Sequence, residues 1–291
     1  MMLHRALRAL NKVNPTCRGR GRIAELAHRI GAIPADGPYQ VAAGVTMELR
    51  MDEWFCRSIY FHAFDILSSR TVFKSLRPGS VFVDVGANLG YYSLGAAQRV
   101  GEEGQVFAFE PNLTTLARLR RNVDLSQAGM IRVFDCALSD APGQAVLHAP
   151  PEPTMHGHAS LVNQDWVDDV QTTVPVRRLD DVLGQTLSRL DTIKIDAEGC
   201  ELAVLRGAER LVRTFKPSIL VELNRDTANS FGYSPLDIPR LLLSFDPNYR
   251  FRHVESHRTR DVTMLELESR QIVYGDLFAY QPHNECDGNR G

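Results

Sequence analysis

Short apolar runs alternate with amphipathic stretches through the middle of the chain. The apolar runs are rich in β-branched and aromatic residues and lack polar alternation, as strands buried on both faces require. The predicted strands are Val81–Val85, Gln105–Phe109, Ile131–Cys136, Thr192–Ile195 and Ser218–Leu223. Helical spacing fills the gaps near Tyr91–Val100, Leu113–Leu125 and Glu201–Phe215. This alternation predicts βαβ units and a doubly wound α/β fold with a mostly parallel sheet.

The flanking regions carry further patterns. Val45–Met51 alternates as a strand does, and Glu53–Leu76 has helical spacing that ends at the turn signal Pro78-Gly79. After the core, the pattern predicts a helix over Pro235–Ser244 and strands over Tyr249–Val254, Val262–Leu267 and Asp276–Ala279. We therefore divide the chain into an N-terminal extension of helices and a strand (1–75), one α/β domain (76–282) and a frayed tail (283–291).

A Pro-rich excursion interrupts the alternation at Ala149–Asp169. Strands are predicted on either side of it, at Ala145–Leu147 and Gln171–Val176, and Asp180 is predicted to cap a short helix beginning near Asp181. Long segments with little secondary structure are often binding loops or lids, so we expect this excursion to become ordered with ligands. Its His156-Gly157-His158 sequence is expected to be polar loop rather than a metal site, because no acid stands beside it at ligand spacing.

A glycine-rich turn, Gly86-Ala87-Asn88-Leu89-Gly90, follows the first buried strand and its acid Asp84. Glycine lets the backbone approach a ligand closely, and Asn88 tolerates the left-handed conformation better than other non-glycine residues. In open α/β sheets, ligands bind beyond the carboxyl ends of the strands where the strand order reverses. The turn lacks the G-x-G-x-x-G of dinucleotide enzymes and the G-K-[ST] of a P-loop, which counts against an NAD-linked oxidoreductase.

The second predicted strand ends in an acid, Glu110, followed by Pro111. Glu110 lies 20 residues after Gly90, the spacing of an acid that accepts hydrogen bonds from ribose hydroxyls. Alone, Glu110 is as well explained as a helix cap. Together with the glycine turn, it predicts a nucleoside-binding site.

Three blocks in order resemble the FkbM-type family of S-adenosylmethionine-dependent methyltransferases: D-V-G-A-N-x-G at Asp84–Gly90, A-L-S-D at Ala137–Asp140 and K-I-D-x-E-G at Lys194–Gly199. The resemblance covers roughly residues 75–225. It implies a seven-stranded Rossmann-like class I methyltransferase sheet. It also implies O-methylation of a hydroxyl on a sugar or on a polyketide- or macrolide-type small molecule. N-methylation of a peptide or amide side chain and a non-catalytic donor-binding module are the alternatives.

The resemblance assigns the donor site to residues after the first three predicted strands. They are Asp84, Gly86, Ala87, Asn88 and Gly90 at the turn, Glu110 and Pro111 after the second strand, and Asp135, Cys136 and Ala137 after the third. Tyr91 either places its ring against the cationic sulfonium or simply packs. The chain departs from the family pattern at His158-Ala159, where a small polar residue is common, and at Cys200, where Gly or Ala is common.

Acids also follow the fourth and fifth predicted strands. Asp196 and Glu198 are two apart, so on an extended segment they would point the same way. As a pair they would act as base and acceptor anchor, or bind a divalent cation, which we do not favour. In the alternative interpretation Asp196 caps the next helix and Glu198 pairs with Lys194 or an arginine. Glu222 is a further acceptor-side candidate.

Composition and charge indicate which classes of partner the protein binds. With 44% hydrophobic and 23% charged residues, the 291-residue chain is an ordinary globular protein. A net charge of −2 does not favour nucleic acid, and no apolar run approaches the roughly 18 residues of a membrane span. The five cysteines are odd in number and form no C-x-x-C, which indicates reduced thiols rather than disulfides or zinc. We expect a cytoplasmic protein with a small-molecule acceptor.

The first 30 residues are locally basic, with seven Lys or Arg against one acid, Glu25. Leu3, Ala6, Leu7 and Leu10 recur at helical spacing. The segment is either a helix for a membrane surface or an anionic partner, or a solvated appendage packed beside the main domain. The pattern favours the appendage, because both helical pieces are short, and the extension is a candidate lid or homo-oligomer contact.

Overall fold

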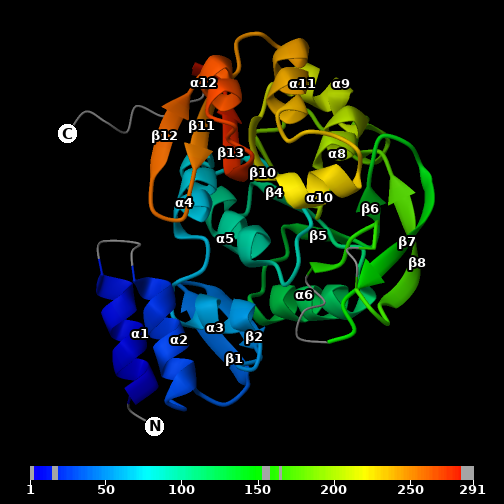
Figure 1. Ribbon diagram of the computed structural model, residues 1–291. Coiled ribbons are helices and arrows are strands. Elements are labelled where there is room, and N and C mark those ends of the chain that lie inside the picture. The colour runs from blue at the N-terminus through cyan, green and yellow to red at the C-terminus, as the bar shows by residue number, and fades with distance from the viewer. Residues whose placement is uncertain (1–2, 15–18, 153–157, 164–165, 283–291) are drawn as a thin grey trace.

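The protein is described by a computed structural model that covers residues 3–14, 19–152, 158–163 and 166–282. An eight-stranded sheet runs through the molecule in the order β12-β11-β13-β10-β9-β3-β4-β5 (Figure 1). From one edge to the other these strands are β12 (Thr259–Val262), β11 (Arg250–Val254), β13 (Tyr274–Tyr280), β10 (Ser218–Asn224), β9 (Thr192–Ile195), β3 (Val81–Val85), β4 (Gln105–Phe109) and β5 (Ile131–Phe134). Strands β10, β9, β3, β4 and β5 are parallel. The doubly wound α/β class is confirmed, with eight strands in this sheet rather than seven.

The strand order reverses between β3 and β9. From β3 the chain adds β4 and then β5 on one side, and it returns to add β9 and β10 on the other. Successive strands on opposite sides of β3 leave a crevice at the carboxyl ends of β3 and β9, where ligands of such sheets bind. The glycine turn and Asp196 both lie directly after these two strands.

Alternating side chains of the central strands enter two cores. Phe82 and Val106 pack on one face, under α4 (Ile66–Ser75), α5 (Tyr91–Val100) and α6 (Leu113–Leu125). Val83 and Phe107 pack on the opposite face. That second face is covered by α7 (Leu179–Leu183), α8 (Glu201–Gly207), α9 (Glu209–Phe215) and α11 (Asp237–Phe245). None of the described helices is long and apolar enough to cross a membrane.

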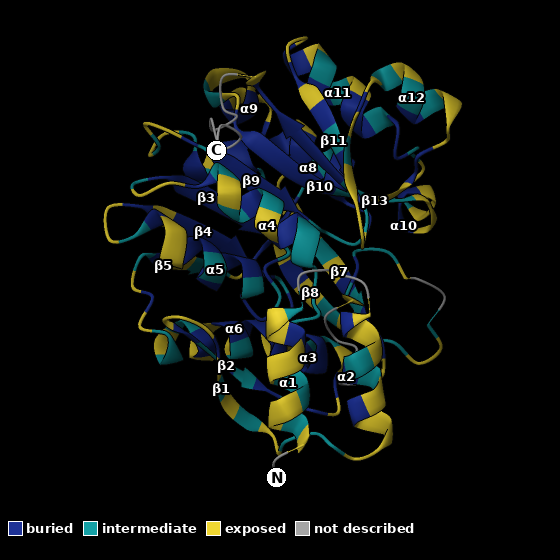
Figure 2. Ribbon diagram, turned by 90° about the vertical axis from the view of Figure 1, so that its left-hand side faces the viewer, coloured by how far each residue is buried: buried dark blue, intermediate teal, exposed yellow. Residues whose placement is uncertain are grey.

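The N-terminal region contains α1 (Leu3–Val13), α2 (Arg20–Arg29), β1 (Gly37–Ala42), β2 (Val45–Leu49) and α3 (Trp54–Tyr60). The predicted strand at Val45 is present, paired with β1, which the pattern did not indicate. This hairpin is anchored on α6, where Asn122 Oδ1 accepts from the backbone N–H of Glu48 at 2.8 Å. Met47 and Leu49 are fully buried in the core shared with α5 and α6. The extension is therefore packed against α5 and α6 at one end of the molecule (Figure 2); a domain boundary at residue 75 stays a prediction.

Four sequence predictions of local structure are wrong. The helix predicted over Glu53–Leu76 is divided, because α3 ends at Tyr60 and α4 begins only after Asp65, which has a left-handed φ of 39°. The helix predicted over Glu201–Phe215 is divided at Ala208. The strand predicted over Val262–Leu267 is mostly helix α12 (Met264–Ser269), started by a capping box between Thr263 and Glu266.

The fourth error concerns Asp180. It lies inside α7, whose N-cap is Arg178, so it does not cap that helix. Instead its carboxylate accepts from the backbone N–H groups of Arg210 and Leu211 at the start of α9, each at 2.9 Å. The Asp180 side chain thus satisfies free N–H groups of a helix that is distant in sequence.

The chain between β5 and α7, on either side of the Pro-rich excursion, forms a small second sheet. Its strands are β6 (Ala137–Leu138), β8 (Val170–Arg177) and β7 (Gly143–Ala149), in that order across the sheet. Two more short helices complete the described structure: α10 (Arg225–Ser230), which directly follows β10, and α12.

Candidate active site

A cavity of about 740 Å³ lies at the carboxyl ends of the central strands. Its lining includes the α3–α4 region, the turns after β3, β4, β9 and β11, and the strands β10 and β13. Residues of α2, of α6, of the small second sheet and of the segment around His158 complete it. The volume falls within the roughly 300–1,000 Å³ of small-molecule sites. We call the part beside the glycine turn and Glu110 the donor half, and the part beside Asp65, Glu222 and Asp276 the acceptor half.

The glycine turn forms one wall of the donor half. Gly86 and Asn88 have left-handed φ values of 70° and 50°, as expected for a turn that tolerates Asn. A Cβ on Gly86 would lie 1.8 Å from the carbonyl oxygen of Asp196, so no side chain fits there. The N–H groups of Gly86 and Ala87 both donate to Phe109 O, at 3.0 and 2.9 Å, which joins the turn to the end of β4.

Glu110 links the two loops of the donor half. Its Oε2 accepts from the N–H of Asn88 and its Oε1 from the N–H of Asn112, both at 2.9 Å. Only 7% of Glu110 is exposed, and burial raises the pKa of its carboxyl to about 7 despite these hydrogen bonds. Asn112, in turn, caps α6 through its side chain. Each Glu110 oxygen keeps a further lone pair for a ligand hydroxyl.

Asp84 and Lys194 form a buried ion pair behind the turn. Asp84 is fully buried and accepts from Ser93 Oγ at 2.6 Å. Lys194 Nζ lies 3.5 Å from Asp84 and 3.6 Å from Asp196, and it donates to Gly86 O at 2.8 Å. Burial alone would lower the pKa of Lys194, but the carboxylates of Asp196 and Asp84 outweigh it and raise the pKa. Asp84 therefore positions the turn from behind the cavity wall.

The other predicted donor residues divide into two groups. Asn88, Pro111, Cys136 and Ala137 line the cavity with Gly86 and Glu110. Outside the lining lie Asp84, Ala87, Gly90, Tyr91 and Asp135. The ring of Tyr91 packs against those of Phe64 and Tyr92, at centroid distances of 5.1 and 5.7 Å, as its packing interpretation expects.

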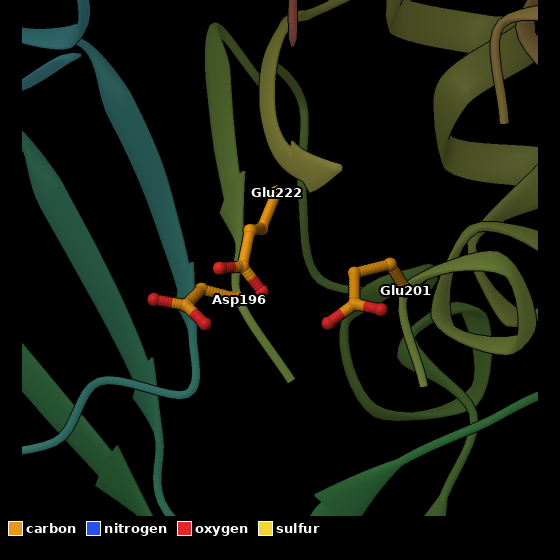
Figure 3. Close-up of side chains that lie close together, drawn as sticks. All are labelled: Asp196, Glu201 and Glu222. Carbon is orange, nitrogen blue, oxygen red and sulfur yellow. The ribbon is translucent and has the colours of Figure 1, made fainter. Parts of the chain in front are cut away.

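Three carboxylates meet where β9 and β10 end (Figure 3). Asp196, Glu201 and Glu222 each offer an oxygen within 4.8 Å of the others. Glu201 accepts from the N–H groups of Ala197 and Gly199, at 2.9 and 3.0 Å, and from the Tyr233 hydroxyl at 2.8 Å. The Glu201 side chain thus accepts hydrogen bonds from the backbone just before α8. The alternative interpretation had assigned the capping of this helix to Asp196. Asp196 and Glu222 lie side by side and line the cavity.

Glu198 faces a different partner. Strand β9 ends at Ile195 and Glu198 has a left-handed φ of 49°, so the expectation of an extended segment carrying Asp196 and Glu198 is wrong. Glu198 Oε1 lies 3.3 Å from Nδ1 of His158, and this hydrogen bond raises the pKa of His158. Both side chains line the cavity. His156, the other histidine of the predicted loop, lies outside the described residues.

The acceptor half contains two acids that no sequence motif indicated, Asp65 and Asp276. The Tyr92 hydroxyl donates to Asp65, and Ser68 Oγ donates to Asp276. Burial, followed by the charge of Asp65, raises the pKa of Asp276 to about 8. Burial, followed by the charge of Asp196, raises the pKa of Glu222 to about 10. At neutral pH Glu222 is therefore protonated.

Comparison with known proteins gives a family match and several relatives. Residues 84–252 match the family described as the methyltransferase FkbM domain. "Methyltransferase 1" of Beauveria bassiana is 28% identical over 50% of this chain and 64% of its own length. "31-O-demethyl-FK506 methyltransferase FkbM" of Streptomyces tacrolimicus is 32% identical over 46% of this chain and 61% of its own. "Hexuronic acid methyltransferase AglP" of Haloferax volcanii is 25% identical over 60% of this chain and 65% of its own.

In each of these three relatives the matched region spans less than two thirds of the relative's length. The family match itself covers more than half of this chain and includes the glycine turn, Glu110, Asp196 and Glu222. The resemblance drawn from the three sequence blocks is thereby confirmed, and the chain belongs to the methyltransferase FkbM domain family.

Proposed function

We propose that the protein transfers a methyl group from S-adenosylmethionine to a hydroxyl of a small molecule held in the cavity. The observation that carries this proposal is the junction of the glycine turn and Glu110 at the point where the strand order reverses. There the Glu110 carboxylate and the backbone of Asn88 are hydrogen-bonded to each other and both line the cavity. Such an acid beside a glycine turn suits the ribose of a nucleoside donor.

The donor half has the chemistry that S-adenosylmethionine needs. Glu110 offers lone pairs to ribose hydroxyls, and the Gly86 backbone leaves room for close approach. Cys136 and Ala137 supply a small, largely apolar wall for a base. When bound, S-adenosylmethionine supplies an electrophilic methyl group on a sulfonium, and the carboxylate of Asp196, which lines the same cavity, offers a complement to that positive charge.

We assign the acceptor chemistry to Asp196 and Glu222. Asp196 is the most exposed of the three clustered carboxylates, so we infer that it receives the proton of the acceptor hydroxyl. Glu222 holds its own proton at neutral pH and is placed to donate a hydrogen bond to the acceptor oxygen. His158, paired with Glu198, is a second titratable group at the same cavity. Aligning the acceptor with the methyl is mainly a task of positioning.

Two relatives guide the class of acceptor. Their names specify a demethylated FK506 and a hexuronic acid, which supports O-methylation of a polyketide-type or sugar-type molecule here. An amine acceptor is the second candidate, because Asp65, Glu222 and Asp276 place several carboxyl groups in the acceptor half. A protonated amine would be held by these groups and would need to lose its proton before methyl transfer.

A labelled-donor screen tests the proposal. The protein is incubated with S-adenosylmethionine carrying a deuterated methyl group and with a panel of hydroxylated natural products, sugars and amines. We expect a methyl ether that is heavier than its acceptor by the labelled methyl group less one hydrogen, and fragmentation that places the label on oxygen. A label on nitrogen would establish the amine candidate, whereas stabilisation by NAD and not by S-adenosylmethionine in thermal unfolding would contradict methyl transfer.

A further inference from the structure

The two N-terminal helices expose an apolar surface that the methyltransferase site does not use. Helices α1 and α2 lie side by side as an antiparallel hairpin at one end of the molecule (Figure 1). Five large apolar side chains on this hairpin are more than half exposed: Leu3, Leu10, Val13, Leu26 and Ile30. We call these five side chains, with the exposed basic residues beside them, the hairpin face.

The inner sides of both helices are fixed to the protein. On α1, Asn11 is fully buried and donates to Phe61 O at 2.8 Å, and His4 Nδ1 lies 2.8 Å from the Tyr60 hydroxyl. On α2, Ala24 and Ala27 are buried. The exposed apolar side chains are therefore on the outer sides and cannot turn inward without unpacking the hairpin.

Helical spacing gathers the exposed residues into stripes. Leu3, Leu10 and Val13 are seven and three residues apart on α1, and Leu26 and Ile30 are four apart on α2. These spacings place each set on one side of its helix. The two helices are packed side by side, and each stripe lies on the exposed part of its helix (Figure 1). Scattered exposed apolar residues would need no explanation, but aligned stripes mark an interaction surface.

Charge distinguishes the hairpin from the rest of the chain. Residues 1–30 hold seven Lys or Arg and one acid, whereas the whole chain has a net charge of −2, so the remainder is net negative. Arg5, Lys12 and Arg22 are exposed on the two helices. Long basic side chains beside an apolar stripe can reach lipid headgroups while the stripe enters the acyl boundary.

We propose that the hairpin face docks on an anionic lipid membrane. The apolar stripes would be buried at the headgroup boundary, and Arg5, Lys12 and Arg22 would face the negative surface. Trp54, 61% exposed at the start of α3, lines the cavity, as does Gly21 of α2. Docking would therefore place one side of the cavity opening near the membrane, and it requires no helix that spans the bilayer.

Vesicle sedimentation of the full chain tests this inference independently of methyl transfer. We expect binding to phosphatidylcholine vesicles that contain phosphatidylglycerol, little binding to phosphatidylcholine alone, and release in about 1 M salt, where the screening length is about 3 Å. Leu10→Ser/Leu26→Ser should weaken binding by at least about tenfold. Arg5→Gln and Lys12→Gln should each weaken it by about fivefold. The matched control Val146→Ser/Leu265→Ser alters exposed apolar residues elsewhere and should bind as the parent does.

Three results would overturn the inference. One is no binding to either vesicle, and another is equal binding to charged and neutral vesicles. The third is a dimer by light scattering that Leu10→Ser/Leu26→Ser dissociates while vesicle binding is absent, which would assign the face to a second copy of the chain. Circular dichroism of each variant shows whether the hairpin remains folded, since all substituted side chains are on its outer side.

Discussion

Burial raises the pKa of carboxyl groups in both halves of the cavity, but these groups differ in their partners. In the donor half, Glu110 accepts two backbone hydrogen bonds, and Asp84, behind the cavity wall, is paired with Lys194. In the acceptor half, Glu222 and Asp276 are buried among other acids, and burial with that repulsion raises their pKa values to about 10 and 8. Glu222 Oε2 is buried without a hydrogen-bond partner among the described residues.

This difference suits the two tasks. Donor binding requires a rigid site, because nucleotide-like ligands are recognised by fixed donors and acceptors. Proton handling requires groups whose pKa values differ, so that one accepts a proton while another keeps its own. We therefore expect variants in the donor half to change donor affinity, and variants in the acceptor half to change turnover and pH dependence.

The largest effect is expected at Asp196. Asp196→Asn keeps the shape but removes the base, so turnover should fall by about 10²–10⁴ while donor affinity changes little. Glu222→Gln keeps a hydrogen-bond donor at this position and should therefore retain more turnover than Asp196→Asn. Activity and donor titration are measured for both, with and without chelator; direct proton transfer predicts no effect of the chelator. Near-normal turnover in Asp196→Asn and Glu198→Gln would make these acids structural.

A smaller effect is expected from a pair of glycine substitutions. Gly79 and Gly86 both have left-handed φ values, but a Cβ on Gly79 meets nothing within 4 Å, whereas one on Gly86 lies 1.8 Å from Asp196 O. Gly79→Ala should cost about 1–2 kcal/mol of stability and leave donor binding intact. Gly86→Ala should cost more and should abolish tight donor binding. Equal unfolding free energies and equal donor affinities in the two variants would contradict the close packing of the turn.

The smallest effect concerns stability against pH in the absence of ligands. A carboxyl whose pKa is raised on folding keeps a proton that the unfolded chain has released, so the unfolding free energy falls as pH rises between the two pKa values. This interval runs from 3.8 to about 8 for Asp276 and from 4.5 to about 10 for Glu222. Glu222→Gln and Asp276→Asn should each flatten this decline, by at most about 1.4 kcal/mol per pH unit. Chemical denaturation at several pH values measures the slope, and an unchanged slope in both variants would show that these acids are not protonated in the folded state.

Sequence patterns indicated only part of the donor half, because five of the residues assigned to it lie outside the cavity lining: Asp84, Ala87, Gly90, Tyr91 and Asp135. The turn at Gly86–Gly90, the acid Glu110 and the helix Leu113–Leu125 are each a local signal, and the structure places the turn and acid together. The acceptor half is assembled from Asp65, Glu222 and Asp276, which lie in separate elements. No local period links such residues, so only the fold brings them to one cavity.

Some of the wrong predictions of local structure can be explained from the sequence. Thr263 and Glu266 form a T-x-x-E capping signal, which would have indicated helix α12 instead of a strand. Asp65 had no such signal, because Glu53–Leu76 has continuous helical spacing, although the structure breaks the helix between Tyr60 and Ile66. Asp196 and Glu198 were paired on the assumption of an extended backbone, and the left-handed φ of Glu198 could not be inferred from its residue type.

Calorimetric titration of S-adenosylmethionine into the wild-type protein and into Glu110→Ala tests the central claim most directly. The donor assignment predicts that the wild-type protein binds and that Glu110→Ala binds about ten- to a hundredfold more weakly, because charge-assisted hydrogen bonds worth about 1.5–3 kcal/mol are lost. Burial raises the pKa of the Glu110 carboxyl to about 7. The affinity of the wild-type protein for S-adenosylmethionine should therefore also increase from pH 6 to pH 8, as this carboxyl ionises. Unchanged affinity in a folded Glu110→Ala protein would contradict the assignment of this cavity half to the donor.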